Sequence, residues 1–295
     1  MNTYETITNH IIATLETGVI PWRKEWKTTG KNGGGCLPYN LISGKAYRGV
    51  NVLTLMCSGY ASTGWATYKQ AQTLGYQVRK GEKSTPVVWW NFPTKEERLQ
   101  GRAPYAKLFR VFNLEQLDGV PATLPLEDAE PFNAIASAEA VANNYMAGPS
   151  HPSLAHGGSS AYYSPSYDRV QMPPREAFTA PEAYYSTLYH EFVHSTGIKG
   201  RCDREELQGI QRFGDCDYSK EELTAEFGAA FLCAEAGISN EPILTNSVAY
   251  IQNWISKLQN DKTLAVQAAQ RAQKAADYIL GRTFGEDAGP VAAEE

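Results

Sequence analysis

One five-residue stretch of the chain has the residue types and the spacing of a metal-dependent hydrolase. It reads H-E-F-V-H, from His190 to His194, inside the predicted helix PEAYYSTLYHEFVHSTG. Residues four apart lie on one face of a helix, so both imidazoles can reach the same ion. Glu191 then lies beside that ion, where its carboxylate can take a proton from a water molecule. The motif predicts a site for Zn²⁺, with Mn²⁺ or Co²⁺ as alternatives on the same donors.

A third protein ligand is required, because catalytic zinc sites take three side chains and leave one position to water. The later stretch KEELTAEFGAAFL offers Glu222 and Glu226, which are four apart on one helix face. Spacing alone leaves open which of the two binds the metal. Together the two motifs resemble the gluzincin pattern, in which the earlier carboxylate binds metal and the later one accepts a hydrogen bond from a ligand histidine. The resemblance implies Glu222 as the ligand and Glu226 as the residue that orients an imidazole.

Other polar residues of the second half are weaker candidates. We expect His151 and His156 to be ordinary loop residues. The segment AYYSPSYDRVQMP before the motif predicts a strand, and in zincins an edge strand at this place pairs with extended peptide. Three tyrosines could donate a hydrogen bond to an oxyanion, although packing accounts for each of them more simply: Tyr162, Tyr163 and Tyr218.

The elements that must position these side chains are mainly helices. Pro181 suits a first helical turn, and Gly197, Gly237 and Gly281 suit helix ends. Apolar spacing and these signals predict helices over 133–146, 181–196, 220–236, 245–259 and 263–280, a loop over 148–160, and short strands near 161–163 and 169–172. In the basic half, Thr67 followed by Gln70 predicts a short capped helix, and VRKGEKSTPVVWWNF and YAKLFRVFNL predict two strands separated by the polar connection PTKEERLQGRAP.

Charge divides the chain into two unlike halves. Residues 1–126 contain 15 Lys and Arg against 8 Asp and Glu, a net charge of +7. The remaining residues contain 12 against 24, a net charge of −12. Such asymmetry indicates a polyanion-binding unit joined to a different one. We therefore expect an α+β protein with a small α+β DNA-binding domain over 1–118, a linker over 119–131, a metal-binding α+β domain over 132–284, and a disordered tail over 285–295.

Cations and flat rings alternate in the basic half, and single-stranded nucleic acid needs both, because cations follow phosphates while rings stack on unpaired bases. One group flanks a glycine-rich stretch predicted to be a mobile loop, although its rings suit packing equally well. A second group surrounds a turn where nothing structural requires three cations. Four further rings lie in apolar strands and are expected to be core: Trp89, Trp90, Phe109 and Phe112. The predicted DNA-binding residues are Trp22, Lys24, Trp26, Arg79, Lys80 and Lys83.

Composition excludes several classes of protein. No stretch approaches 18 consecutive apolar residues, so no membrane-spanning helix is expected. The first twenty residues lack the basic start and apolar block of a secretory signal. The five cysteines show no CxxC pair, which favours reduced thiols in a cytoplasm, with a Cys202–Cys216 disulfide as the minor alternative.

Runs in both halves, and in the same order, resemble the ArdC-type antirestriction proteins of conjugative plasmids. The runs include PWRKEW, YNLISGKAYRGVN, YHEFVHSTG and KEELTAEFGAAFLCAEAGI, and the resemblance extends to about Leu280. It implies a single-stranded-DNA-binding domain followed by a zincin-like metallopeptidase domain of the gluzincin type. It also implies a bacterial cytoplasmic protein that protects incoming plasmid DNA from restriction.

Three functions agree with these features. In the first, the chain binds single-stranded DNA through residues 1–126 alone and cleaves proteins. The candidate substrates are DNA-bound proteins, including restriction enzyme subunits, or the protein itself. In the second, it only shields the strand, and its metal site is structural or vestigial. In the third, it is a repair protease that acts on DNA–protein crosslinks.

Overall fold

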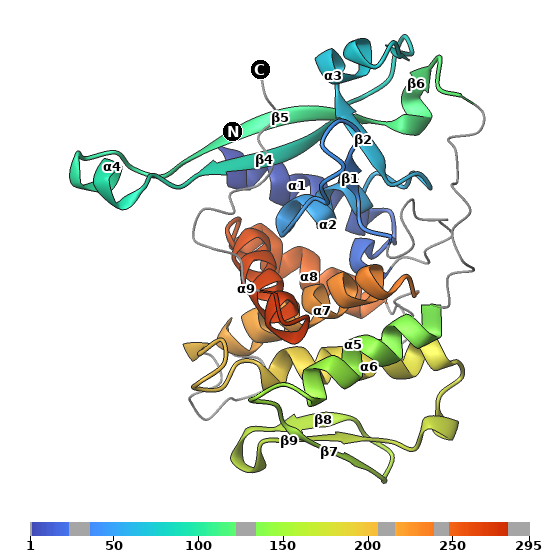
Figure 1. Ribbon diagram of the computed structural model, residues 1–295, viewed down its shortest axis with the longest axis vertical. Coiled ribbons are helices and arrows are strands. Elements are labelled where there is room, and N and C mark those ends of the chain that lie inside the picture. The colour runs from blue at the N-terminus through green and yellow to red at the C-terminus, as the bar shows by residue number, and fades with distance from the viewer. Residues whose placement is uncertain (1, 24–35, 122–133, 206–215, 239–247, 283–295) are drawn as a thin grey trace.

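The computed structural model describes residues 2–23, 36–121, 134–205, 216–238 and 248–282. Lys24, Trp26, most of the predicted linker and the predicted tail lie outside these ranges. Helices and sheets are mixed in both halves, which confirms the predicted α+β class. In Figure 1 the sheet of the basic half lies at one end of the molecule and the sheet of the acidic half at the other, with helices packed between them.

The basic half contains a four-stranded sheet. Its strands are β1 Tyr39–Asn40, β2 Gly64–Thr67, β4 Thr85–Asn91 and β5 Tyr105–Asn113, in the order β1-β2-β5-β4. The antiparallel β4 and β5 extend from the body as an arm (Figure 1). The connection predicted between these two strands forms a short helix at the tip of the arm, α4 Lys95–Leu99. A separate pair of short strands joins β3 Gln77–Val78 to β6 Leu117–Asp118.

Two helices of the basic half are fixed by side-chain hydrogen bonds. Thr67 accepts a hydrogen bond from the backbone N–H of Gln70, so the predicted cap of α3 Tyr68–Thr73 is confirmed. Asn51, from the unpredicted helix α2 Val50–Met56, bonds through its side chain to the N–H and C=O of Val88. Because β4 is an edge strand, this amide satisfies backbone groups that the sheet leaves unpaired.

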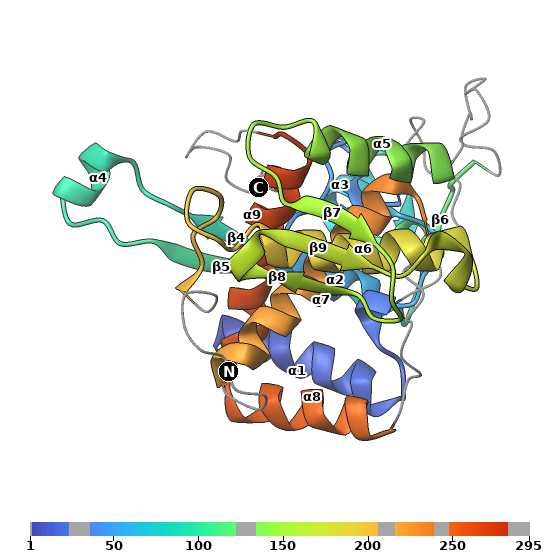
Figure 2. The same ribbon diagram turned by 90° about the horizontal axis from the view of Figure 1, so that it is seen from below.

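Helix α1 Thr3–Glu16 joins the two halves of the chain. Its residues Ile7, Ile11 and Leu15 are completely buried, and they belong to one apolar cluster with residues of the acidic half. The helix contacts α8 Val248–Asn260 and α9 Leu264–Ile279, beside which it lies in Figure 2. The basic and acidic halves therefore share one hydrophobic core.

The acidic half packs helix α6 Pro181–Ser195 against a small sheet. The order of its three strands is β7 Ser153–His156, β9 Arg169–Met172 and β8 Tyr162–Ser164. Strands β8 and β9 were predicted, whereas β7 lies in the predicted loop 148–160. The remaining helices are α5 Ala134–Met146 and α7 Cys216–Ala236. Helix α7 begins four residues before the predicted start.

A glycine allows α6 and α7 to pack closely. A Cβ atom added at Gly228 would lie 2.6 Å from the nearest methyl carbon of Val193. Such a contact is shorter than any that packed side chains adopt, so only glycine fits this position of α7.

We predict that Gly228→Ala destabilises the protein by about 1–3 kcal/mol, because the added methyl group forces the helices apart. Helix propensity alone would instead stabilise this variant by about 0.8–1.0 kcal/mol, so the sign of the change identifies the cause. Urea unfolding measures the free energy of unfolding of Gly228→Ala and of the matched double variant Gly228→Ala/Val193→Ala. Removing the Val193 methyls should recover part of the loss, and a more stable Gly228→Ala would contradict the close contact.

Candidate metal centre

Three side chains from α6 and α7 converge on one point. The Nε2 atoms of His190 and His194 are 3.1 Å apart. A carboxylate oxygen of Glu222 lies 3.7 Å from Nε2 of His190, and the other lies 3.6 Å from Nε2 of His194. Two ligands about 2.1 Å from a tetrahedral ion are separated by roughly 3.4 Å. All three separations lie near this value, and the two nitrogens and one carboxylate suit a divalent cation.

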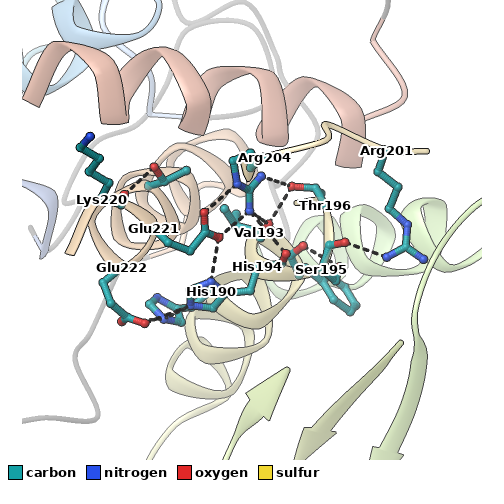
Figure 3. A network of polar contacts seen from close by, with 12 residues as sticks. His190, Val193, His194, Ser195, Thr196, Arg201, Arg204, Lys220, Glu221 and Glu222 are labelled. Atoms are coloured by element: carbon teal, nitrogen blue, oxygen red, sulfur yellow. Dashed lines mark hydrogen bonds and ion pairs between the residues drawn. The ribbon is translucent and has the colours of Figure 1, made fainter. Parts of the chain in front are cut away.

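A buried chain of hydrogen bonds orients one of the two imidazoles (Figure 3). Nδ1 of His194 lies 3.0 Å from a carboxylate oxygen of Glu221, which is 2% exposed. Arg204 donates to both oxygens of that carboxylate, at 2.8 and 2.6 Å. The same guanidinium donates to the carbonyl of Val193 at the end of α6. With the proton of His194 held on Nδ1, its Nε2 lone pair is directed at the metal position.

This arrangement corrects the role that the sequence assigned to Glu226. Glu221 accepts the bond from His194, whereas Glu226 accepts hydrogen bonds from Arg23 and from the Tyr250 hydroxyl, at 2.7 and 2.8 Å. Residues 222 and 226 share a face of α7, but residue 221 is turned by one helical step toward the last turn of α6. The sequence signal for Glu221 was the first glutamate in the run KEEL, which spacing by fours does not single out.

Electrostatics at the centre favour a charged His194 when no ion is present. Burial favours the neutral imidazole, but the hydrogen bond to Glu221 and the charge of Glu222 outweigh it and raise the pKa of His194 to about 9. Burial also opposes ionisation of Glu221, yet hydrogen bonds from His194 and Arg204 lower its pKa to about 2. Metal must therefore displace a proton from the imidazole below pH 9.

A cleft of about 640 Å³ lies beside the ligands. Glu191, which is 8% exposed, lines it next to His190. One wall is the segment 158–161, which leads into the edge strand β8. Small side chains make much of the rest: Ala161, Ala177, Ala183, Ser186, Thr187 and Ala229.

The other polar residues considered for this site make contacts outside the metal centre. The hydroxyl of Tyr163 donates to Asp168, and Tyr162 is 46% exposed on the edge strand. His156 bonds to the Tyr184 hydroxyl from strand β7 rather than from a loop, and His151 bonds to a neighbouring carbonyl. Cys202 carries a free thiol, so the alternative disulfide is wrong. The side chains of Tyr218 and Cys216 lie outside the described part of the chain.

The basic half reaches this cleft through two consecutive residues. Arg23, at the end of the 3₁₀ turn Pro21–Arg23, lines the cleft and pairs with Glu226. Trp22 is 1% exposed and meets Phe227 edge to face, with ring centroids 5.0 Å apart. The prediction that Trp22 stacks on DNA is therefore wrong, because its ring is part of the core.

The three cations predicted around a turn do not behave alike. The guanidinium of Arg79 pairs with Glu82 at 2.9 Å and donates to the carbonyl of Glu115. It therefore holds the turn together, a structural role that the sequence did not indicate. Lys80 and Lys83 are exposed and stay candidates for phosphate contacts.

The metal ligands on two helices beside an edge strand define a zincin-like centre. Residues 140–271 match the family described as "Zincin-like metallopeptidase", and residues 1–112 match the "N-terminal domain of anti-restriction factor ArdC". Crystal structures of the antirestriction ArdC protein from the R388 plasmid, metal-free and Mn(II)-bound, are 37% identical to this chain. Both structures cover 95% of this chain. The aligned region covers 97% of the metal-free structure, with a TM-score of 0.70, and 98% of the Mn(II)-bound structure, with a TM-score of 0.71. The chain belongs to this ArdC-type antirestriction family.

Two curated relatives are similar in sequence to nearly the whole chain. An uncharacterised protein, y4eC of Sinorhizobium fredii, is 37% identical over 298 residues, with 94% of this chain and 91% of that protein covered. The DNA primase TraC of Escherichia coli is 35% identical over 296 residues, but the chain spans only 20% of its length. Within the described ranges, no helix has both the length and the apolar composition needed to cross a membrane.

We predict that Glu221→Gln weakens metal binding by about 10–100-fold, because the charge that aligns and polarises His194 is lost. Glu226→Gln is the matched control, since it removes the same charge from the same helix five residues further on. Competition with a chromophoric chelator measures both affinities. A larger loss in Glu226→Gln than in Glu221→Gln would restore the role first assigned to Glu226.

We further predict that metal uptake releases about one proton at neutral pH, since a ligand histidine must be neutral. Calorimetric titration in buffers of different ionisation enthalpy counts this proton. The affinity should rise with pH and level off near pH 9, where His194 loses its proton. Proton-independent binding between pH 6 and 8 would contradict the charged state of His194.

Proposed function

We propose that this protein is a metal-dependent peptidase that also binds single-stranded DNA and protects incoming conjugative plasmid DNA from restriction in the bacterial cytoplasm. The observation that carries the proposal is the convergence of His190, His194 and Glu222 next to a cleft that His190 and the buried Glu191 line. A structural metal site needs no cleft and no adjacent carboxylate, whereas peptide hydrolysis requires both.

The residues of the cleft divide the work of amide hydrolysis. His190, His194 and Glu222 would hold a divalent cation, Zn²⁺ or Mn²⁺, which when bound would supply Lewis-acid polarisation of the scissile carbonyl. Glu191 accepts a proton from the attacking water and returns it to the leaving nitrogen. Its low exposure keeps bulk water away from that carboxylate and strengthens its interaction with the reacting groups.

The shape of the cleft indicates the form of the substrate. Strand β8 is an edge strand, so its outer backbone groups can pair with an extended peptide. The alanines and small hydroxyl residues around the cleft leave room for main chain and modest side chains. We infer that the substrate is an extended segment of another protein, with DNA-bound restriction enzyme subunits as candidates.

Charge and family membership support the DNA-binding part of the proposal. Residues 1–126 have a net charge of +7, and the N-terminal match is to a domain of an antirestriction factor. Single strands attract such a unit through their phosphates, while the acidic half repels them.

The test compares Glu191→Gln with the wild-type protein and with Glu182→Gln, which removes the same charge near the start of α6. We predict that Glu191→Gln abolishes hydrolysis of a denatured protein substrate while metal content and oligonucleotide affinity stay unchanged. Glu182→Gln should retain all three properties.

The efficiency of conjugation into a restricting host then tests whether hydrolysis is needed to protect the plasmid DNA. We expect Glu191→Gln to lose protection along with hydrolysis. Full protection by an inactive Glu191→Gln would instead establish a DNA-shielding protein, and normal hydrolysis by this variant would remove Glu191 from the mechanism.

A further inference from the structure

The two faces of the β4–β5 arm have different surroundings. Along the strands, Val88, Trp90, Ala106 and Leu108 point to one face and pack on the shared core. The alternate residues point to the opposite face, because successive side chains in a strand alternate. That face carries Trp89, Tyr105, Lys107 and Phe109, which we call the ring platform.

The strand register makes the ring platform continuous. Trp89 lies directly opposite Lys107, and Val87 opposite Phe109. The rings of Trp89 and Tyr105 meet edge to face, with centroids 5.8 Å apart, and the ammonium of Lys107 lies 5.0 Å from the Phe109 ring centre. The three rings and the Lys107 ammonium therefore form one row of neighbouring side chains on this face.

The ring platform is accessible at its outer part. Tyr105 is 53% exposed, Lys107 is exposed, and Trp89 is only partly buried, contrary to the expectation that its ring is core. Phe109 is also partly buried, but it packs against a small core cluster that contains Val87 and Val111, as expected. At the base of the ring platform, Trp89 and Phe109 line a small hollow together with the exposed Lys45 and with Arg48. Figure 1 shows β4 and β5 leading away from the body as an arm.

Exposed rings interleaved with cations match one ligand chemistry. Unpaired bases stack on such rings without regard to sequence, and the cations meet the phosphates between them. Duplex DNA cannot use the rings, because its bases are already stacked. The net charge of +7 on residues 1–126 favours a polyanion over a neutral or acidic protein partner at this surface.

We propose that the ring platform is the stacking surface for single-stranded DNA, with Trp89 as its central ring and Lys107 as its phosphate contact. This proposal rests on the proposed DNA binding and names where on the fold the strand lies. It moves the stacking role from the buried Trp22 to the arm.

The test is fluorescence anisotropy of a labelled oligo-dT with the full-length protein and its single variants. Trp89→Ala should weaken binding by about 5- to 150-fold, while Trp89→Phe, which keeps a ring, should recover most of it. Lys107→Ala should lower the slope of log K against log salt by about 0.7. Tyr167→Ala and Lys199→Ala are the matched controls, since both side chains are exposed in the acidic half, and neither should change affinity or slope.

A second measurement covers a Trp89→Ala protein that fails to fold. Oligo-dT containing 5-iodouracil is photocrosslinked to the wild-type protein, and the adducts are mapped by mass spectrometry. The proposal expects adducts on peptides from β4 or β5. If the wild-type protein binds the oligonucleotide but Trp89→Ala binds equally well, or all adducts lie elsewhere, the ring platform is not the site. If the wild-type protein does not bind, the proposed DNA binding fails as well.

Discussion

The contact between Gly228 and Val193 sets the distance between the two helices that carry the metal ligands. Because α6 and α7 approach this closely, a carboxylate from one helix can reach the two imidazoles of the other, and Glu221 can reach Nδ1 of His194. Arg204 then ties the end of α6 to α7 by bonding to both. The ligands are therefore aligned by packing and by buried hydrogen bonds before any ion binds.

Helix α7 also contacts the basic half of the protein. Its Glu226 pairs with Arg23, and its Phe227 packs against the ring of Trp22. Near the end of the helix, the Ala234 carbonyl accepts a hydrogen bond from the N–H of Cys36. The core continues from α1 into α8 and α9 without interruption. In the proposed function, a strand bound to the basic half and a peptide bound in the cleft would therefore be held by one continuous core.

Several parts of the structure that depend on neighbouring residues in the sequence were predicted correctly. The spacing of His190 and His194, the cap at Thr67 and the periodic helices of the acidic half each depend on neighbours a few residues away. The choice between Glu221 and Glu226 depends on the register of two helices, and the burial of Trp22 depends on a partner about two hundred residues later in the chain. Strand β7 was missed because its pairing with β9 spans a loop and a second strand. Such long-range contacts leave no periodic signal in the sequence.

The account as a whole depends on where the ion binds. Anomalous diffraction from crystals of this protein soaked in Mn²⁺ or Zn²⁺ would locate it directly. The account predicts one strong peak bound by Nε2 of His190, Nε2 of His194 and the Glu222 carboxylate, with Glu226 still bonded to Arg23. A peak coordinated by Glu226 in place of Glu222, or no peak between α6 and α7, would contradict it.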